Sequence, residues 1–80
     1  MTKKEKREQK IRDNPYNVSL EDFEALVNQY GYIREGGKHA KAMIGQRVFA
    51  YKRINPVDHE YVEKVLEIID QMNKRQVNNG

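Results

Sequence analysis

The chain has 80 residues, of which 38 % are hydrophobic, so it has room for one domain with a modest core. It contains no cysteine, which excludes disulfides, a thiol nucleophile and Cys-ligated metals. Two histidines alone do not build a zinc site, so we expect no metal and no cofactor. No apolar run approaches the roughly 20 residues of a membrane span, and the N-terminus lacks the apolar core of a signal peptide. We therefore expect a soluble protein of the cytoplasm that does not enter a membrane.

The net charge of +3 is distributed unevenly along the chain. Residues 34–53 contain six basic side chains and a single acidic one, Glu35. Residues 54–73 contain five acidic side chains and one lysine. A basic segment beside acidic ones is typical of surfaces that bind phosphate backbones, and ordinary scatter of surface charge is the alternative explanation.

The first 13 residues are predicted to form a basic, mobile tail. Residues 1–12 carry six basic and two acidic side chains, and after Met1 their only apolar residue is Ile11. A helix formed here would have no apolar face to bury, so we expect it to remain outside the domain. The domain is then predicted over residues 14–75, with a frayed C-terminus over residues 76–80.

The first helix of the domain is predicted to begin after Ser19 and to end before Gly31. Ser19 is a candidate N-cap, Asp22 has the spacing of a capping box, and Val18 and Phe23 have that of a hydrophobic staple. Gly31 is expected to end the helix in the left-handed conformation, which glycine adopts without strain. Apolar residues in this segment recur at helical spacing and form one stripe: Leu20, Phe23, Leu26, Val27 and Tyr30.

Three short strands are predicted next, the first at residues 32–34 and closed by residues 35–37. Gly45-Gln46 fits a two-residue type II′ hairpin turn, which requires a positive φ at its first residue. This turn predicts that Ile44 pairs with Arg47 and that His39 pairs with Lys52. Strand alternation then separates two faces. One contains Ala40, Ala42, Ile44, Phe49 and Tyr51, and the other contains His39, Lys41, Met43, Val48, Ala50 and Lys52.

A second helix is predicted after Asn55-Pro56, with Asp58 as its N-cap and Val57 and Val62 as a staple. Its core stripe is expected to contain Val62, Val65, Leu66, Ile69 and Met72. The predicted fold class is thus α+β, with a three-stranded antiparallel sheet and two helices on one face. In the simplest packing, both helices cover the face with the alanines and aromatics, and the His39 face is left for solvent or a partner.

Several short motifs resemble the HicA toxin family in their order and spacing. Residues 14–19 read Asn-Pro-Tyr-Asn-Val-Ser and precede a helix that ends in Tyr30-Gly31-Tyr32, followed by Gly36-Gly37-Lys38-His39. Residues 55–57 read Asn-Pro-Val and lead into Tyr61-Val62 and a helix with Val-Leu-Glu-Ile-Ile at residues 65–69. The similarity covers residues 14–73.

This resemblance implies a double-stranded-RNA-binding-domain-like fold of the order α-β-β-β-α. It also implies a type II toxin that cleaves messenger RNA independently of the ribosome and is neutralised by a HicB-like antitoxin. The family histidine at the start of the second strand matches His39, so the resemblance makes His39 the catalytic residue. The chain departs from the family pattern in having Lys38 in place of the usual serine and Ala40 in place of a bulky residue.

The chemistry of RNA cleavage explains why a histidine fits this position. Removing the proton of a ribose 2′-hydroxyl, so that its oxygen attacks the adjacent phosphorus, requires a base that titrates near neutral pH. Lys38, Lys41 and Lys52 are expected to bind the phosphate and to stabilise the added negative charge of the transition state. Gly36 and Gly37 would let the backbone approach the phosphate and offer N–H donors. Since no metal-ligand cluster is present, we expect a metal-independent endoribonuclease.

Two other interpretations of the same residues stay open. In one, the basic face belongs to a non-catalytic RNA-binding module, and in the other the chain is a protein-interaction domain that does not contact RNA. His59, at the start of the second helix, is interpreted as a surface residue. The other aromatic residues near the sheet are assigned to the core or its edge rather than to base stacking: Tyr30, Tyr32, Phe49 and Tyr51.

Overall fold

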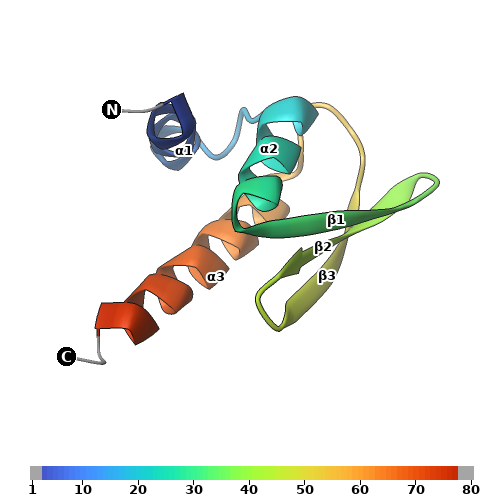
Figure 1. Ribbon diagram of the computed structural model, residues 1–80. Coiled ribbons are helices and arrows are strands. Elements are labelled where there is room, and N and C mark those ends of the chain that lie inside the picture. Colours follow the sequence, from blue (N-terminus) through green and yellow to red (C-terminus); the bar gives the residue numbers. More distant parts are fainter. Residues whose placement is uncertain (1–2, 78–80) are drawn as a thin grey trace.

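The computed structural model describes residues 3–77, which form three helices and a three-stranded antiparallel sheet (Figure 1). The helices are α1 (Lys3–Asp13), α2 (Leu20–Tyr30) and α3 (His59–Val77), and the strands are β1 (Gly31–Gly36), β2 (His39–Ile44) and β3 (Arg47–Lys52). From α2 onward the order is the predicted one, so the α+β class is confirmed. Of the C-terminal residues expected to fray, residues 76 and 77 belong to α3, and residues 78–80 lie outside the described part of the chain.

The N-terminal end of α2 has two side-chain acceptors. The Ser19 hydroxyl accepts a hydrogen bond from the backbone N–H of Asp22 at 3.1 Å, which confirms the predicted N-cap. The side-chain oxygen of Asn55 accepts another from the N–H of Leu20 at 3.0 Å. The first N–H groups of a helix have no partner within it, so both acceptors stabilise this end. Through this hydrogen bond, Asn55 also connects the segment after β3 to the start of α2.

The C-terminal end of α2 differs from the prediction. Gly31 has an extended backbone with φ −163°, not a left-handed one, and it is already the first residue of β1. A Cβ at this position would lie 1.8 Å from the carbonyl oxygen of Met43 in β2. Glycine is therefore required because the two strands approach each other closely, and the helix continues into the strand without a loop.

The sheet contains two hairpins, and both have two-residue turns. The β2–β3 hairpin has the predicted register, with Ile44 opposite Arg47 and His39 opposite Lys52. Gly45 has φ +60°, and positive φ values in the described chain occur only at glycines, in agreement with a type II′ turn. β1 is longer than predicted, because it extends to Gly36 and turns at residues 37–38 instead of ending at residue 34.

α2 and α3 cover one face of the sheet and leave the other open (Figure 1). The Phe49 ring of β3 is stacked near the Tyr61 ring of α3, with 6.4 Å between centroids. The fully or almost fully buried residues of these elements are Phe23, Leu26, Val27, Ala40, Ala42, Ile44, Tyr51, Val62, Val65, Ile68 and Ile69. Ile68 was absent from the predicted stripe of α3, whereas Leu66 and Met72 are only half-buried at its edge. The two predicted faces of the β2–β3 hairpin are confirmed.

Residues 3–13 do not form the expected tail. They form α1, which packs against α2, and Ile11 is only 2 % exposed within the hydrophobic core. Arg12 donates to Asp70 of α3 at 2.8 Å, and the Tyr30 hydroxyl donates to Glu8 at 2.5 Å. The expectation that this helix has nothing to bury was wrong, because one apolar side chain and a few paired polar groups attach it to the other helices.

Candidate nucleic-acid interface

The open face of the sheet consists of three rows of residues, each row running across the three strands in register. The rows are Gly36, His39 and Lys52; Arg34, Lys41 and Ala50; and Tyr32, Met43 and Val48. Eight of these nine residues are exposed, and Met43 is half-buried. Strand alternation directs all of them to the same side, away from α2 and α3. We call this surface the outer face.

The two rows nearest the β1–β2 turn carry the positive charge of the outer face. Arg34 is directly opposite Lys41, and His39 is directly opposite Lys52. Neighbouring strands are about 4.8 Å apart, and like charges at opposite positions destabilise a sheet. Within residues 3–77, none of these four side chains has an ion pair or hydrogen bond. Only Arg34 and Lys41 are permanently charged partners in one row, and an anionic ligand would offset the repulsion between them.

The single acidic residue of the basic segment does not compensate this charge. Alternation places Glu35 on the helix side of β1, where its carboxylate pairs with Arg53 at 3.1 Å. Arg53 also contacts Glu24 of α2 at 3.2 Å, and Glu24 accepts a hydrogen bond from the Tyr51 hydroxyl at 2.6 Å. Burial, together with that hydrogen bond, raises the pKa of Tyr51 well above its ordinary value. Glu35 and Glu24 are thus paired on the helix side, and the nine residues of the outer face include basic side chains but no acidic one.

A shallow hollow of about 340 Å³ lies beside His39. Its lining includes Arg34, Gly36, Lys41 and Ala50 of the outer face, together with Glu35 and Ala40 from the same strands. Because glycine and alanine have little or no side chain, they leave space between the flanking cations. The volume falls within the range of about 300–1,000 Å³ that is usual for ligand pockets. The hollow therefore offers room for a small anionic group next to the imidazole.

The structure brings most of the predicted site residues together. His39, Lys41 and Lys52 share the outer face, and Gly36 is opposite His39. Lys38 is exposed in the β1–β2 turn, where its carbonyl accepts a hydrogen bond from the backbone N–H of Arg53 at 3.2 Å. This contact fixes the turn to the end of β3, so that Lys38 stays beside His39.

Glycine is required at position 37 by the backbone conformation of the β1–β2 turn, and not by close packing against another residue. Its φ is +69°, a conformation that side chains rarely adopt, and a Cβ there would meet no atom within 4 Å. The space above this glycine is open. A ligand could therefore approach the backbone of the turn without a side chain in its way.

Sequence reasoning missed two residues of the outer face, Arg34 and Tyr32. Arg34 completes the cationic row with Lys41, and Tyr32 is 59 % exposed, so its assignment to the core or its edge was wrong. Both follow from the register of β1 against β2. A two-residue turn at Gly37-Lys38 was the signal that could have predicted this register. The other three aromatic residues assigned to the core or its edge are buried or half-buried: Tyr30, Phe49 and Tyr51.

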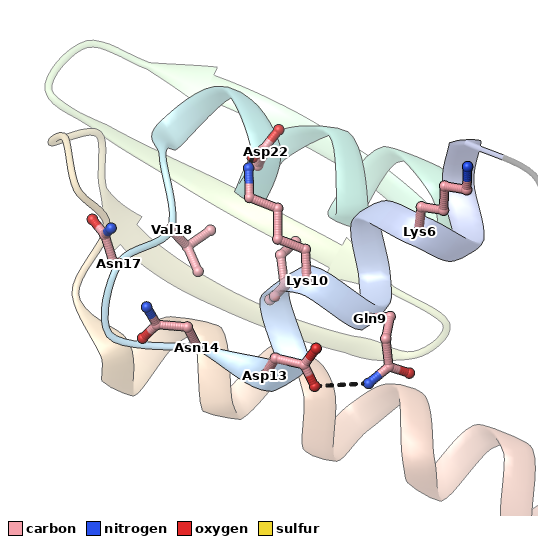
Figure 2. A pocket seen from close by; sticks show the side chains of 9 residues that line it. Lys6, Gln9, Lys10, Asp13, Asn14, Asn17, Val18 and Asp22 are labelled. Atoms are coloured by element: carbon pink, nitrogen blue, oxygen red, sulfur yellow. Dashed lines mark hydrogen bonds and ion pairs between the residues drawn. The ribbon is translucent and has the colours of Figure 1, made fainter.

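A second hollow, of about 430 Å³, lies between α1 and the start of α2 (Figure 2). Figure 2 shows Lys10 reaching toward Asp22, with 3.7 Å between Nζ and the carboxylate, and Arg7 is 4.0 Å from the same carboxylate. Gln9 donates a hydrogen bond to Asp13 at 2.9 Å. These charged and polar groups contact one another, and the hollow contains none of the predicted site residues.

Features outside the outer face add no further candidate chemistry. His59 lies at the start of α3 with its ring 4.7 Å from that of Tyr16. Among residues 3–77, no three His, Asp or Glu side chains are grouped so as to hold a metal ion, and no helix is long and apolar enough to cross a membrane. No family model, curated protein or solved structure matches the chain. The outer face is therefore the candidate functional site of the described chain.

Proposed function

We propose that this chain is a HicA-like toxin with a double-stranded-RNA-binding-domain-like fold, which binds messenger RNA on its outer face and cleaves it with His39. The observation that supports the proposal best is the position of His39. It is an exposed histidine opposite Lys52, next to the Arg34–Lys41 pair, on a face without a carboxylate. Opposed cations that weaken a sheet are better explained by an anionic ligand than by stability.

In the proposed reaction, the cations hold the RNA backbone and the imidazole moves the proton. Neutral His39 accepts the proton of a ribose 2′-hydroxyl, and the 2′-oxygen forms a bond to the adjacent phosphorus. Lys41 and Lys52 stabilise the additional negative charge on the phosphoryl oxygens. The bond from phosphorus to the 5′-oxygen then breaks, and that oxygen takes up a proton from water or from a nearby lysine ammonium such as Lys38. The products are a 2′,3′-cyclic phosphate and a 5′-hydroxyl.

The proposal includes a HicB-like antitoxin as a partner in the cytoplasm. His39 is exposed, and no part of the described chain covers it. A nuclease site that is open in this way is accessible to a second protein that blocks it. The antitoxin would have to cover the outer face or compete with RNA for it.

The experiment that tests the proposal compares the two histidines. Purified parent protein should cleave messenger RNA, and His39→Gln should abolish cleavage while retaining most of the RNA affinity. His59→Gln is the matched control, because it removes the other imidazole at an exposed position on α3 and should leave cleavage unchanged. Cleavage that survives in His39→Gln would contradict the catalytic role. The outer face would then be better explained as a non-catalytic RNA-binding surface.

A further inference from the structure

The third row of the outer face has no role in the proposed reaction. Tyr32 and Val48, at its two ends, are 59 % and 53 % exposed, and Met43 lies between them. Single exposed apolar side chains are ordinary on protein surfaces. Here, however, two large ones share a row on the open side of a sheet, where they adjoin the Arg34–Lys41 row.

The distance between these rows limits what can cover both of them. Tyr32 and Arg34 are two residues apart on one strand, which corresponds to about 7 Å. A ligand that covers both rows must have an apolar, flat part and an anionic part within that reach. A nucleotide has both, since its base can lie on the Tyr32 ring while its phosphate lies beside Arg34 or Lys41.

The base must be unpaired to make this contact. In a duplex, the faces of each base are covered by the bases above and below it, and only the edges and the backbone are accessible. In a single strand, one base can leave the stack and lie on an aromatic ring. An exposed aromatic ring at position 32 would therefore favour single-stranded over double-stranded RNA, whereas cations alone bind the phosphates of both.

We infer that Tyr32 is a stacking platform for one unpaired base, and that the outer face binds single-stranded RNA in preference to duplex RNA. This inference rests on the proposed function, because it assumes that the Arg34–Lys41 row binds RNA phosphates. It adds the strandedness of the substrate and a residue that selects it. Tyr32 binds substrate in this scheme and takes no part in the proton transfer.

The test measures the affinity for 2′-O-methyl oligonucleotides, which lack the attacking hydroxyl and stay intact with the parent protein. Tyr32→Ala should weaken binding of an unstructured single strand about 5- to 150-fold, the equivalent of the about 1–3 kcal/mol of one base–aromatic stack, and should leave duplex binding unchanged. Tyr32→Phe should bind like the parent, since the ring is retained. Tyr16→Ala is the matched control, because Tyr16 is 64 % exposed and lies outside the sheet. Thermal unfolding of each variant verifies the fold.

A single strand of abasic sugar phosphates provides an independent measurement. The parent should bind the abasic strand as weakly as Tyr32→Ala binds the normal strand. Tyr32→Ala should bind the abasic strand with the same affinity as the parent does, because no base is present to stack. If the parent binds RNA in a salt-dependent manner and Tyr32→Ala binds the single strand equally well, the stacking inference is overturned and the proposed function stands. If the parent binds neither the single strand nor the duplex, both fail.

Discussion

Arg12 of α1 lies 2.8 Å from Asp70 of α3, an ion pair between residues 58 positions apart in the chain. The same guanidinium contacts Glu8 at 3.1 Å, and Glu8 accepts the hydrogen bond of Tyr30 in α2. The side chain of Arg12 is 29 % exposed, so water weakens its pairs, whereas the neighbouring Ile11 is almost completely buried. We conclude that apolar burial provides most of the attachment of α1 and that the ion pair orients it.

Ile11→Ala should therefore destabilise the protein more than Arg12→Ala. Truncation of a buried isoleucine costs about 2–4 kcal/mol, and loss of a partly exposed ion pair costs about 1 kcal/mol or less. Urea unfolding followed by circular dichroism measures both free energies. The control is Ile54→Ala, because Ile54 is 45 % exposed and its truncation should change the free energy of unfolding by less than about 0.5 kcal/mol. Equal stability of Ile11→Ala and Ile54→Ala would contradict the docked position of α1.

Gly31→Ala should be among the most disruptive single substitutions in the sheet. The added methyl would lie 1.8 Å from the Met43 carbonyl oxygen, so β1 and β2 would have to separate, at a cost of about 3 kcal/mol or more. Gly36→Ala is the matched control in the same strand, since its Cβ would lie 3.4 Å from the nearest oxygen. It should change the free energy of unfolding by about 0.5 kcal/mol or less. Similar stabilities of the two variants would mean that the strands do not approach as closely as described.

Gly45→Val should destabilise the β2–β3 hairpin through backbone strain. Gly45 has φ +60°, a conformation that a β-branched residue adopts only at a cost of about 1–2 kcal/mol. Gly45→Asn is the control, because asparagine tolerates this conformation better than other side chains. Thermal unfolding should rank the stabilities as parent, then Gly45→Asn, then Gly45→Val. A melting temperature of Gly45→Val equal to that of the parent would argue against the type II′ turn and the register that places His39 opposite Lys52.

Stability should decrease at high pH through the hydroxyls of half-buried Tyr30 and buried Tyr51. The pKa of Tyr30 is raised from 10.0 to about 12, with burial as the largest cause and the hydrogen bond to Glu8 as the next largest. A phenol with a raised pKa in the folded state contributes stability that is fully present below about pH 10 and is lost as the pH rises through about 12. The pKa of Tyr51 is shifted in the same direction. The melting temperature of the parent should thus fall more steeply between these pH values than that of Tyr30→Phe/Tyr51→Phe, and parallel curves would contradict the prediction.

Binding of RNA to the outer face should depend strongly on salt and on individual cations. Each phosphate contact releases counterions, so the apparent affinity should fall steeply from low to physiological salt. Lys41→Glu and Lys52→Glu should weaken binding of all RNA sequences and reduce the salt dependence. Lys6→Glu makes the same change of charge on α1 and should have a much smaller effect. If Lys6→Glu weakens binding as much as Lys41→Glu does, net charge and not the outer face is responsible.

Cleavage by the parent should continue in the presence of a metal chelator and leave a cyclic phosphate. Both results follow if the imidazole of His39 is the base and the 2′-oxygen is the nucleophile. Mass spectrometry of the products distinguishes a 2′,3′-cyclic phosphate from a 5′-phosphate, which a metal-bound hydroxide would produce. Cleavage that stops on addition of chelator would contradict the proposed mechanism.

The sequence by itself determined those features that depend on residues a few positions apart. The Ser19 cap, the Gly45 turn, the pairing of His39 with Lys52 and the two faces of that hairpin are all local. Because side chains alternate along a strand, one turn was enough to place His39, Lys41 and Lys52 together. The candidate site was accessible from the sequence for this reason.

Only the tertiary structure decided the features that depend on distant partners. The docking of α1 through Ile11, the close approach of Gly31 to Met43 and the capping of α2 by Asn55 join segments that the local pattern does not connect. Tyr32 belongs to the same class, since its exposure depends on how β1 is aligned with β2 and on which face the helices leave open. A hydrophobicity pattern indicates that a residue can be buried, but burial also requires a partner surface, and that surface exists only once the chain has folded.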